Sequence, residues 1–424
     1  MKILHLTPHL GGGVGRALAG LVKYSDKSIQ REILCLEAPD KKSILDEIEN
    51  LGCLVHITPE IEKTINLIKG ADIIQIEWWN HPALIKFLLS ISHIKIRLVV
   101  WSHVSGLFSP TIPIELIKHS KSFVFTSASS FGIGALEDLA KNEKDKLTVI
   151  SSSGGFDNFQ FANRNPDSFN IGYIGTLSFS KLHPDYIEFI AGIEKEDFPV
   201  KLIGDIHNKE IMLEQCKQKN LNDLIRFLGF ISPIADALPS IDILAYILNP
   251  LHYGTTENAL LQAMSSGIVP IVLDNSSELN IVQNLQTGMV VKNPFEFKDA
   301  IIWLKKNPVE KERISREASK FVKERFHPAK CAAAFKDIYE NIFCQNKTEI
   351  NFESIFGNEP HQWFLSCQSN RNYFLGLSGK EKISNYEKYG LLEETKGSAY
   401  HFYKLFPDDL ILKKWTEKLN EDYK

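Results

Sequence analysis

Short apolar runs rich in β-branched residues alternate with amphipathic segments from the first residue to about position 340. In the first half we predict strands at 2–7, 32–36, 54–57, 72–78, 97–103, 123–127 and 147–151. Segments with helical spacing lie between most of them, for example at 15–24 and 81–91. Near-continuous apolar strands flanked by helices are typical of a parallel sheet covered on both faces. The pattern therefore predicts a doubly wound, Rossmann-like α/β domain over residues 1–160.

The pattern restarts after a polar break at 165–169. Strands are predicted at 171–177, 201–205, 225–230, 243–248, 268–273 and 288–292, and helices at 183–193, 209–219, 258–266, 296–306 and 309–326. We therefore predict a second Rossmann-like domain over residues 161–327, facing the first across a cleft. Residues 328–344 follow as a further helical segment that begins near Pro328.

Residues 345–424 lack this alternation and hold many aromatic side chains. We predict a mainly helical or irregular appendage there, whose role the sequence does not reveal. Aromatic side chains form protein core more often than carbohydrate-binding platforms, so we expect most of these to be buried.

The 424-residue chain has 48 Lys and Arg against 52 Asp and Glu, a formal net charge of −4, and no long run of like charge. A nucleic-acid partner is therefore not expected. The first ten residues lack the apolar segment of a secretory signal, and no apolar run approaches the roughly 20 residues that cross a bilayer. The 6 cysteines have no metal-binding spacing. These features favour a cytoplasmic protein with free thiols, while contact with the inner face of a membrane through a local patch stays open, as does the oligomeric state.

Two tandem α/β domains usually bind a ligand in the cleft between them, so residues just after strands are the first candidates. A glycine-rich turn at 11–15, with Gly12 and Gly13, follows the first strand and precedes a helix. Its exposed N–H groups favour phosphate, although a tight strand-to-helix turn explains the glycines equally. The turn follows neither the dinucleotide pattern G-x-G-x-x-G nor the Walker pattern.

Two further strand ends carry polar side chains. His103 ends one strand and Glu77 ends a neighbouring strand, so Glu77 is expected either to pair with His103 or to contact a sugar. In the second domain a strand ends near Gly175 and Thr176, and Lys181 follows before a helix. An ammonium group at such a place can stabilise a diphosphate leaving group.

The most specific segment is 249–278. A strand leads into a loop with Gly254, Thr255, Thr256, Glu257 and Asn258, and then into a helix that contains Gln262, a second strand and Glu278. Thr256 is the expected N-cap of the helix, and the loop amides are expected to cradle a phosphate. We expect Gln262 to face back toward this loop.

These linked motifs resemble retaining glycosyltransferases of the GT-B fold, most of all glycosyltransferase family 4, over residues 1–343. The resemblance implies that the turn 11–15 lies near the donor phosphates and acceptor, and that Lys181 binds the donor diphosphate. LLQAMSSGIVPIV (260–272) is similar to the family's Glu-Ala-Met-Ala-x-Gly-x-Pro-Val-Val stretch. Glu278 matches the glutamate that follows this stretch, and His103 the histidine after the mid-domain strand. The helix at 328–343 resembles the one that crosses back onto the first domain.

The sequence departs from the family at three positions. The family's paired glutamates would lie at 254 and 262, where this chain has Gly254 and Gln262, and its arginine is replaced by Thr176. Gln262 can still bind ribose hydroxyls, and Glu257 is a candidate for the lost carboxylate.

The resemblance implies transfer of a sugar, of the hexosyltransferase type, from a UDP- or GDP-linked donor to a hydroxyl. The expected acceptor is a glycan, a lipid-linked glycan or another surface polysaccharide precursor, and the expected outcome is retention. Lys181, His103 and Glu257 are the catalytic candidates. No Asp-x-Asp motif follows a strand, so neither a catalytic metal nor another cofactor is expected.

Three alternatives stay open. A GT-B-like sugar-nucleotide epimerase would use the same donor without an acceptor. The departures at Thr176, Gly254 and Gln262 also suit a non-catalytic sugar-nucleotide-binding or scaffold protein. Only the glycine-rich turn suggests a nicotinamide oxidoreductase.

Overall fold

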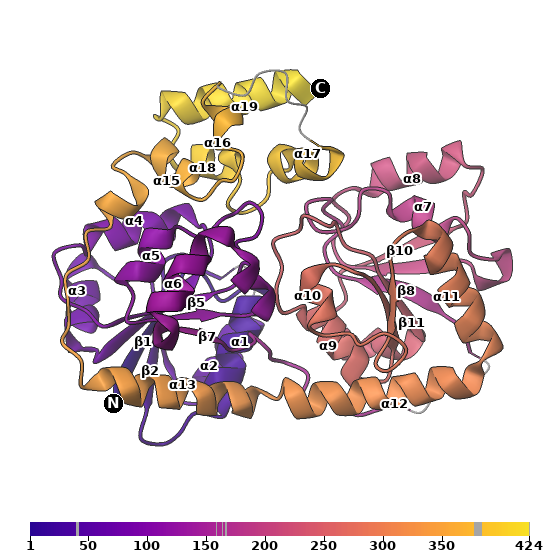
Figure 1. The fold of residues 1–424 in the computed structure, drawn as a ribbon, viewed down its shortest axis with the longest axis horizontal. Coiled ribbons are helices and arrows are strands. Elements are labelled where there is room, and N and C mark those ends of the chain that lie inside the picture. Colours follow the sequence, from indigo (N-terminus) through magenta and orange to yellow (C-terminus); the bar gives the residue numbers. More distant parts are fainter. Residues whose placement is uncertain (40–41, 158, 163, 166–167, 377–383, 424) are drawn as a thin grey trace.

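The computed structural model describes residues 1–39, 42–157, 159–162, 164–165, 168–376 and 384–423. Two parallel sheets stand side by side, and a group of helices from the end of the chain sits above the first of them (Figure 1). The predicted α/β architecture with a helical C-terminal region is confirmed. In the described part of the chain, no helix is both long and apolar enough to cross a membrane.

The first sheet has seven parallel strands in the order β3-β2-β1-β4-β5-β6-β7. Their bounds are Lys2–Thr7 (β1), Gln30–Cys35 (β2), Leu54–Ile57 (β3), Ile73–Trp78 (β4), Leu98–Ser102 (β5), Ser122–Phe125 (β6) and Leu147–Val149 (β7). The helices between them are Gly12–Lys23 (α1), Ser43–Asn50 (α2), Ile61–Gly70 (α3), Pro82–Ser90 (α4), Ile114–His119 (α5) and Glu137–Asn142 (α6). Neighbouring residues of a strand point to opposite faces, so Ile3 packs with α1 and α2 while Leu4 packs with α3 and α4.

The second sheet has six parallel strands in the order β10-β9-β8-β11-β12-β13. They are Ile171–Ile174 (β8), Val200–Ile203 (β9), Ile225–Gly229 (β10), Ile243–Tyr246 (β11), Val269–Leu273 (β12) and Met289–Val291 (β13). The helices are Tyr186–Ile190 (α7), Lys209–Gln218 (α8), Asn258–Ser265 (α9), Ser276–Leu279 (α10), Pro294–Lys306 (α11) and Pro308–Arg325 (α12). Strand β8 is shorter than predicted because the chain turns at Gly175, whose φ of 151° and contact with the Tyr173 ring leave no room for a side chain.

Helix α13, Pro328–Phe343, returns the chain from the second domain to the first, in line with α12 along one edge of the molecule (Figure 1). It packs against α1 and contributes Cys331, Phe335 and Tyr339 to the core of the first domain.

The appendage consists of short helices at Glu353–Phe356 (α14), Pro360–Ser366 (α15), Arg371–Phe374 (α16), Asn385–Leu392 (α17), Ala399–Leu405 (α18) and Leu410–Tyr423 (α19). Helices α15 and α18 pack on α4 of the first domain. Phe364 contacts Phe374, Phe402 and Trp415 of the appendage, all of them buried, and these rings belong to one core cluster with residues of α4. The appendage therefore shares one continuous core with the first domain.

Replacing Phe364 by Ala should lower the free energy of unfolding by about 3–5 kcal/mol, because a large buried ring is lost from this shared core. The matched control is Phe295→Ala, since Phe295 is 81% exposed and should change stability by only about 0.5 kcal/mol. Chemical denaturation measures both. Equal effects of the two variants would show that the appendage is not part of the first domain's core.

Candidate active site

Loops at the carboxyl ends of strands from both sheets meet between the two domains. The Ser105 amide, after β5, donates to the Tyr253 carbonyl oxygen at 2.9 Å. The Thr126 hydroxyl, after β6, donates to Thr255 Oγ1 at 2.6 Å. The glycine-rich turn lies on the same side, because a side chain at Gly13 would contact the Asn258 amide. The two predicted phosphate-binding segments are therefore neighbours.

Several predicted donor-binding residues join the two domains to each other. Asn258 Nδ2 donates to the Ser152 carbonyl oxygen at 3.2 Å, and Gln262 Nε2 donates to the Gly155 carbonyl oxygen at 3.4 Å. Gln262 thus faces the segment between the domains, not the 254–257 loop as predicted.

Thr256 is not the N-cap that the sequence predicts. Helix α9 begins at Asn258 with Glu257 as its N-cap residue, and the Glu257 side chain does not cap the first amides. The Thr256 hydroxyl instead donates to the Thr126 carbonyl oxygen at 3.0 Å and accepts from the Ser152 amide at 3.2 Å. The Thr256 side chain is oriented by partners in the first domain. A local sequence pattern does not contain these partners, so it could not predict the orientation.

Lys181 and Glu257 form an ion pair at the carboxyl ends of β8 and β11, in which Glu257 is buried and the Lys181 side chain is 20% exposed. Lys181 Nζ lies 2.8 Å from Glu257 Oε2, and the Tyr246 hydroxyl donates to the same oxygen at 2.6 Å. Burial alone would lower the pKa of Lys181 and raise the pKa of Glu257, but their mutual attraction shifts both pKa values the other way. Both groups are therefore charged at neutral pH.

Because Gly254 has no side chain, the Glu257 carboxylate has room beside it. A side chain at position 254 would collide with Glu257 Oε1 and with the His252 ring. The Glu257 carboxylate thus occupies the space that a residue at position 254 would need. Whether Glu257 takes the role of the missing carboxylate stays a prediction.

His252 was not singled out from the sequence. Its Nε2 lies 3.1 Å from Glu278 Oε1, and its Nδ1 accepts from the Gly254 amide at 3.0 Å. Burial lowers the pKa of His252, but the Glu278 carboxylate outweighs this and raises it. His252, Glu257 and Glu278 offer ligand atoms within 4.8 Å of one another, and the Lys181 ammonium is in contact with the group. The one available sequence signal was the position of His252 two residues before Gly254.

On the first domain, Glu77 lies fully buried between two histidines. Its carboxylate is 2.8 Å from His103 Nε2 and 3.0 Å from His5 Nδ1. Burial would raise the pKa of Glu77, but hydrogen bonds to His103 and His5 hold it below its usual value. Among the described residues, the buried Nδ1 of His103 has no hydrogen-bond partner. Of the two expectations for Glu77, pairing with His103 is the one observed, and this pairing fixes the orientation of the ring.

Glu393 of the appendage reaches into the loop between Gly175 and Lys181, and sequence reasoning missed it. Its carboxylate accepts from the Phe179 amide at 2.7 Å, the Ser180 amide at 3.1 Å and Asn208 Nδ2 at 2.8 Å, and also from the Ser178 hydroxyl. The partners lie about 200 residues away in sequence, so no local motif could reveal them. This one side chain holds the loop that carries Lys181.

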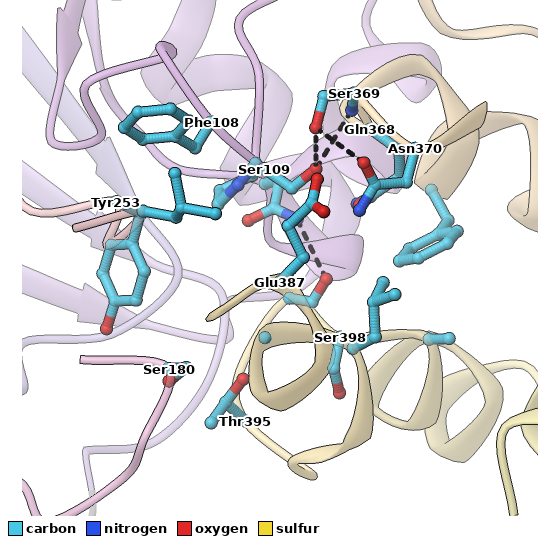
Figure 2. A pocket seen from close by; sticks show the side chains of 18 of the residues that line it. Phe108, Ser109, Ser180, Tyr253, Gln368, Ser369, Asn370, Glu387, Thr395 and Ser398 are labelled. Atoms are coloured by element: carbon cyan, nitrogen blue, oxygen red, sulfur yellow. Dashed lines mark hydrogen bonds between the residues drawn. The ribbon is translucent and has the colours of Figure 1, made fainter. Parts of the chain in front are cut away.

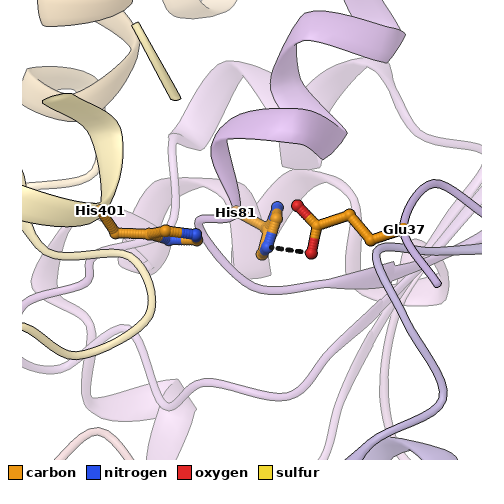
Figure 3. A group of neighbouring side chains, drawn as sticks. All are labelled: Glu37, His81 and His401. Atoms are coloured by element: carbon orange, nitrogen blue, oxygen red, sulfur yellow. Dashed lines mark ion pairs between the residues drawn. The ribbon is translucent and has the colours of Figure 1, made fainter. Parts of the chain in front are cut away.

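Glu37, His81 and His401 form a second group with the composition of a metal site (Figure 3). His81 Nε2 lies 3.5 Å from Glu37 Oε2. However, His81 Nδ1 accepts from the Ala83 amide and His401 Nδ1 from the Gly397 amide. Each neutral ring therefore carries its proton on Nε2, the atom that would have to bind a metal. The group is better described as a contact between the appendage and the first domain.

Comparison with known proteins agrees with this fold. Residues 155–321 match the family described as Glycosyl transferases group 1. The chain is similar to Anabaena HepE in complex with UDP and glucose, with a TM-score of 0.67 and 15% identity over 80% of this chain and 100% of that chain. For a glycosyltransferase from Rickettsia africae the TM-score is 0.60, with 17% identity over 81% and 99% of the two chains. A search of curated proteins gave no significant match. These findings support a glycosyltransferase of the GT-B fold.

Replacing Glu393 by Ala should lower the free energy of unfolding by about 2–4 kcal/mol, because buried donors of the 178–180 loop and Asn208 lose their acceptor. Glu394→Ala is the matched control, since the Glu394 side chain is exposed. Chemical denaturation compares the two. If the variants are equally stable, Glu393 does not hold the loop.

Acid should destabilise the contact in Figure 3. Burial and nearby positive charge lower the pKa of His81 to about 2 and that of His401 to about 4, from 6.5. The unfolded chain therefore binds protons first, so this stability is complete above pH 6.5 and is lost as the pH falls toward the folded-state values. Between pH 6.5 and 5, His401→Gln should flatten the dependence of unfolding free energy on pH by up to about 1.4 kcal/mol per pH unit. The control His93→Gln changes an exposed histidine and should leave the dependence of unfolding free energy on pH unaltered. Equal pH dependence in the original chain, His401→Gln and His93→Gln would contradict the lowered pKa of His401.

Proposed function

We propose that this protein is a retaining, metal-independent glycosyltransferase that moves a sugar from a nucleotide-sugar to an acceptor hydroxyl. The observation that carries the proposal is the Lys181–Glu257 ion pair, with Glu257 buried and Lys181 partly exposed, held where strands β8 and β11 end between the two domains. It lies within a region that matches a glycosyltransferase family.

In the proposed reaction, the bond between the anomeric carbon and the diphosphate oxygen breaks while a bond to the acceptor oxygen forms. Negative charge grows on the leaving diphosphate, and the Lys181 ammonium stabilises it. The acceptor proton leaves with the diphosphate, whose oxygen becomes basic as the bond breaks. His103, oriented by Glu77, offers its unpaired Nδ1 to the sugar or to the acceptor.

Glu257 has two roles in this proposal. Without donor it balances the Lys181 charge, which would otherwise be buried alone. Once a diphosphate contacts Lys181, the Glu257 carboxylate can accept hydrogen bonds from the donor sugar. Gln262 and Glu278 complete the donor side.

The proposed donor is UDP-linked, because Anabaena HepE is described in complex with UDP and with UDP-glucose. The similar protein WaaB is described as a lipopolysaccharide outer core galactosyltransferase. We extend the proposal to a glycan-type acceptor, free or lipid-linked. We also propose a cytoplasmic location, which includes the inner face of the membrane.

One observation favours a second candidate, a non-catalytic sugar-nucleotide-binding protein. Gly254, Gln262 and Thr176 stand where the family that the chain resembles has two glutamates and an arginine, whereas Lys181 is kept. Such a protein would bind donor without transferring its sugar, whereas an epimerase would convert the donor without an acceptor. Incubating the donor alone and with glycan acceptors separates these activities.

Among UDP-, GDP-, ADP- and CMP-sugars, the UDP series should raise the melting temperature. At one hundred times its dissociation constant, a ligand adds about 2.7 kcal/mol of stability. Lys181→Ala should remove this shift, whereas Lys195→Ala, which changes an exposed lysine of the same domain, should keep it. Melting each variant without nucleotide controls for folding. No shift with any nucleotide would contradict the proposed function.

A further inference from the structure

A cavity of about 190 Å³ lies where all three parts of the molecule meet (Figure 2). The first domain contributes Asn80 and the segment 108–110, and the second contributes Ser180, Asn249, Leu251 and Tyr253. The remaining described wall residues all belong to the appendage and lie at 364–374 and 386–399.

The cavity adjoins the candidate active site through two of its walls. Ser180 precedes Lys181, and its amide is held by Glu393. Tyr253 lies between His252 and Gly254, in the loop that leads to Glu257. A ligand in the cavity would therefore lie beside the loops expected to hold the donor.

Polar groups in the wall are available to a ligand. Gln368 is only 5% exposed, yet within the described residues its side-chain amide makes no hydrogen bond. The Gln368 amide atoms are not among the buried polar atoms that lack a partner, so they are open to the cavity and available to a bound molecule. The Thr395 hydroxyl is likewise without a partner among the described residues, whereas the Asn249 amide is used by the Phe179 and Tyr386 carbonyl oxygens.

The other walls define the chemistry of that molecule. Phe108, Phe364 and Phe374 supply aromatic surface next to the amide and hydroxyl groups. Among the described wall residues, the charged ones are one acid, Glu387, and one base, Lys396, whose ammonium lies 2.8 Å from His9 Nε2. This mixture suits a neutral molecule with several hydroxyl groups and an apolar C–H face, as in a sugar ring. The volume is below the roughly 300–1,000 Å³ of sites for larger ligands, so it fits one ring.

We infer that this cavity is a saccharide-binding subsite that holds a hexose ring of the acceptor, with the appendage forming most of its wall. The inference rests on the proposed function, since it assigns the acceptor side of the same cleft. Gln368 and Thr395 donate to and accept from ring hydroxyls, and the aromatic side chains contact the C–H face.

The test uses the full chain, saturated with UDP, and methyl glycosides of glucose, galactose, mannose and N-acetylglucosamine as probes. Saturation-transfer NMR detects their binding. At least one glycoside should bind, and Gln368→Leu should weaken it roughly three- to tenfold, the effect of losing about one hydrogen bond. The matched control is Gln286→Leu, because Gln286 is exposed and is not among the described residues that line the cavity. Thr395→Trp, which fills the cavity, should abolish binding.

The UDP dissociation constant, measured for every variant, separates this inference from the proposed function. It should be unchanged in Gln368→Leu and Gln286→Leu. If UDP binds but no glycoside does, the subsite is refuted and the donor site stands. The same holds if UDP binds and Gln368→Leu and Thr395→Trp bind the glycoside as tightly as the original chain. If UDP does not bind but a glycoside does so in a Gln368-dependent way, the cavity stands and the proposed function fails.

Discussion

A carboxylate buried without a partner costs several kcal/mol, and the arrangement of the cleft follows from how Glu257 avoids that cost. The ammonium of Lys181 and the hydroxyl of Tyr246 both contact one of its oxygens. Lys181 comes from the loop after β8 and Tyr246 from the end of β11, two neighbouring strands. The ion pair therefore joins two loops at the carboxyl ends of these central strands. Gly254 leaves the space that the Glu257 carboxylate fills. In the proposed reaction, this places the Lys181 cation where the leaving diphosphate needs it.

The appendage adds a second constraint, because a short segment of it touches both sides of the cleft. Glu393 binds the 178–180 loop of the second domain, whereas the Gly397 carbonyl oxygen accepts from Asn80 of the first. The aromatic core around Phe364 joins the appendage to the first domain. We therefore expect the appendage to move with the first domain if the cleft opens, and the Glu393 contacts to be the ones that break.

The sequence was sufficient for the fold because strands buried on both faces produce continuous apolar runs, and every predicted strand is present. It also located the loops of the cleft, since they follow those strands. Contacts between segments far apart in the chain could not be predicted from the sequence. Thr256 points to Thr126 instead of capping its helix, and Glu393 reaches a loop more than 200 residues earlier. Such contacts depend on how domains pack, which periodicity does not encode.

The most direct test of the central claim is a crystal structure of the full chain with UDP bound. We predict that the diphosphate lies between the two domains, within hydrogen-bonding distance of Lys181 Nζ, with the Glu257 carboxylate shifted from its present contact. A diphosphate bound elsewhere, with the Lys181–Glu257 pair intact at 2.8 Å, would contradict it.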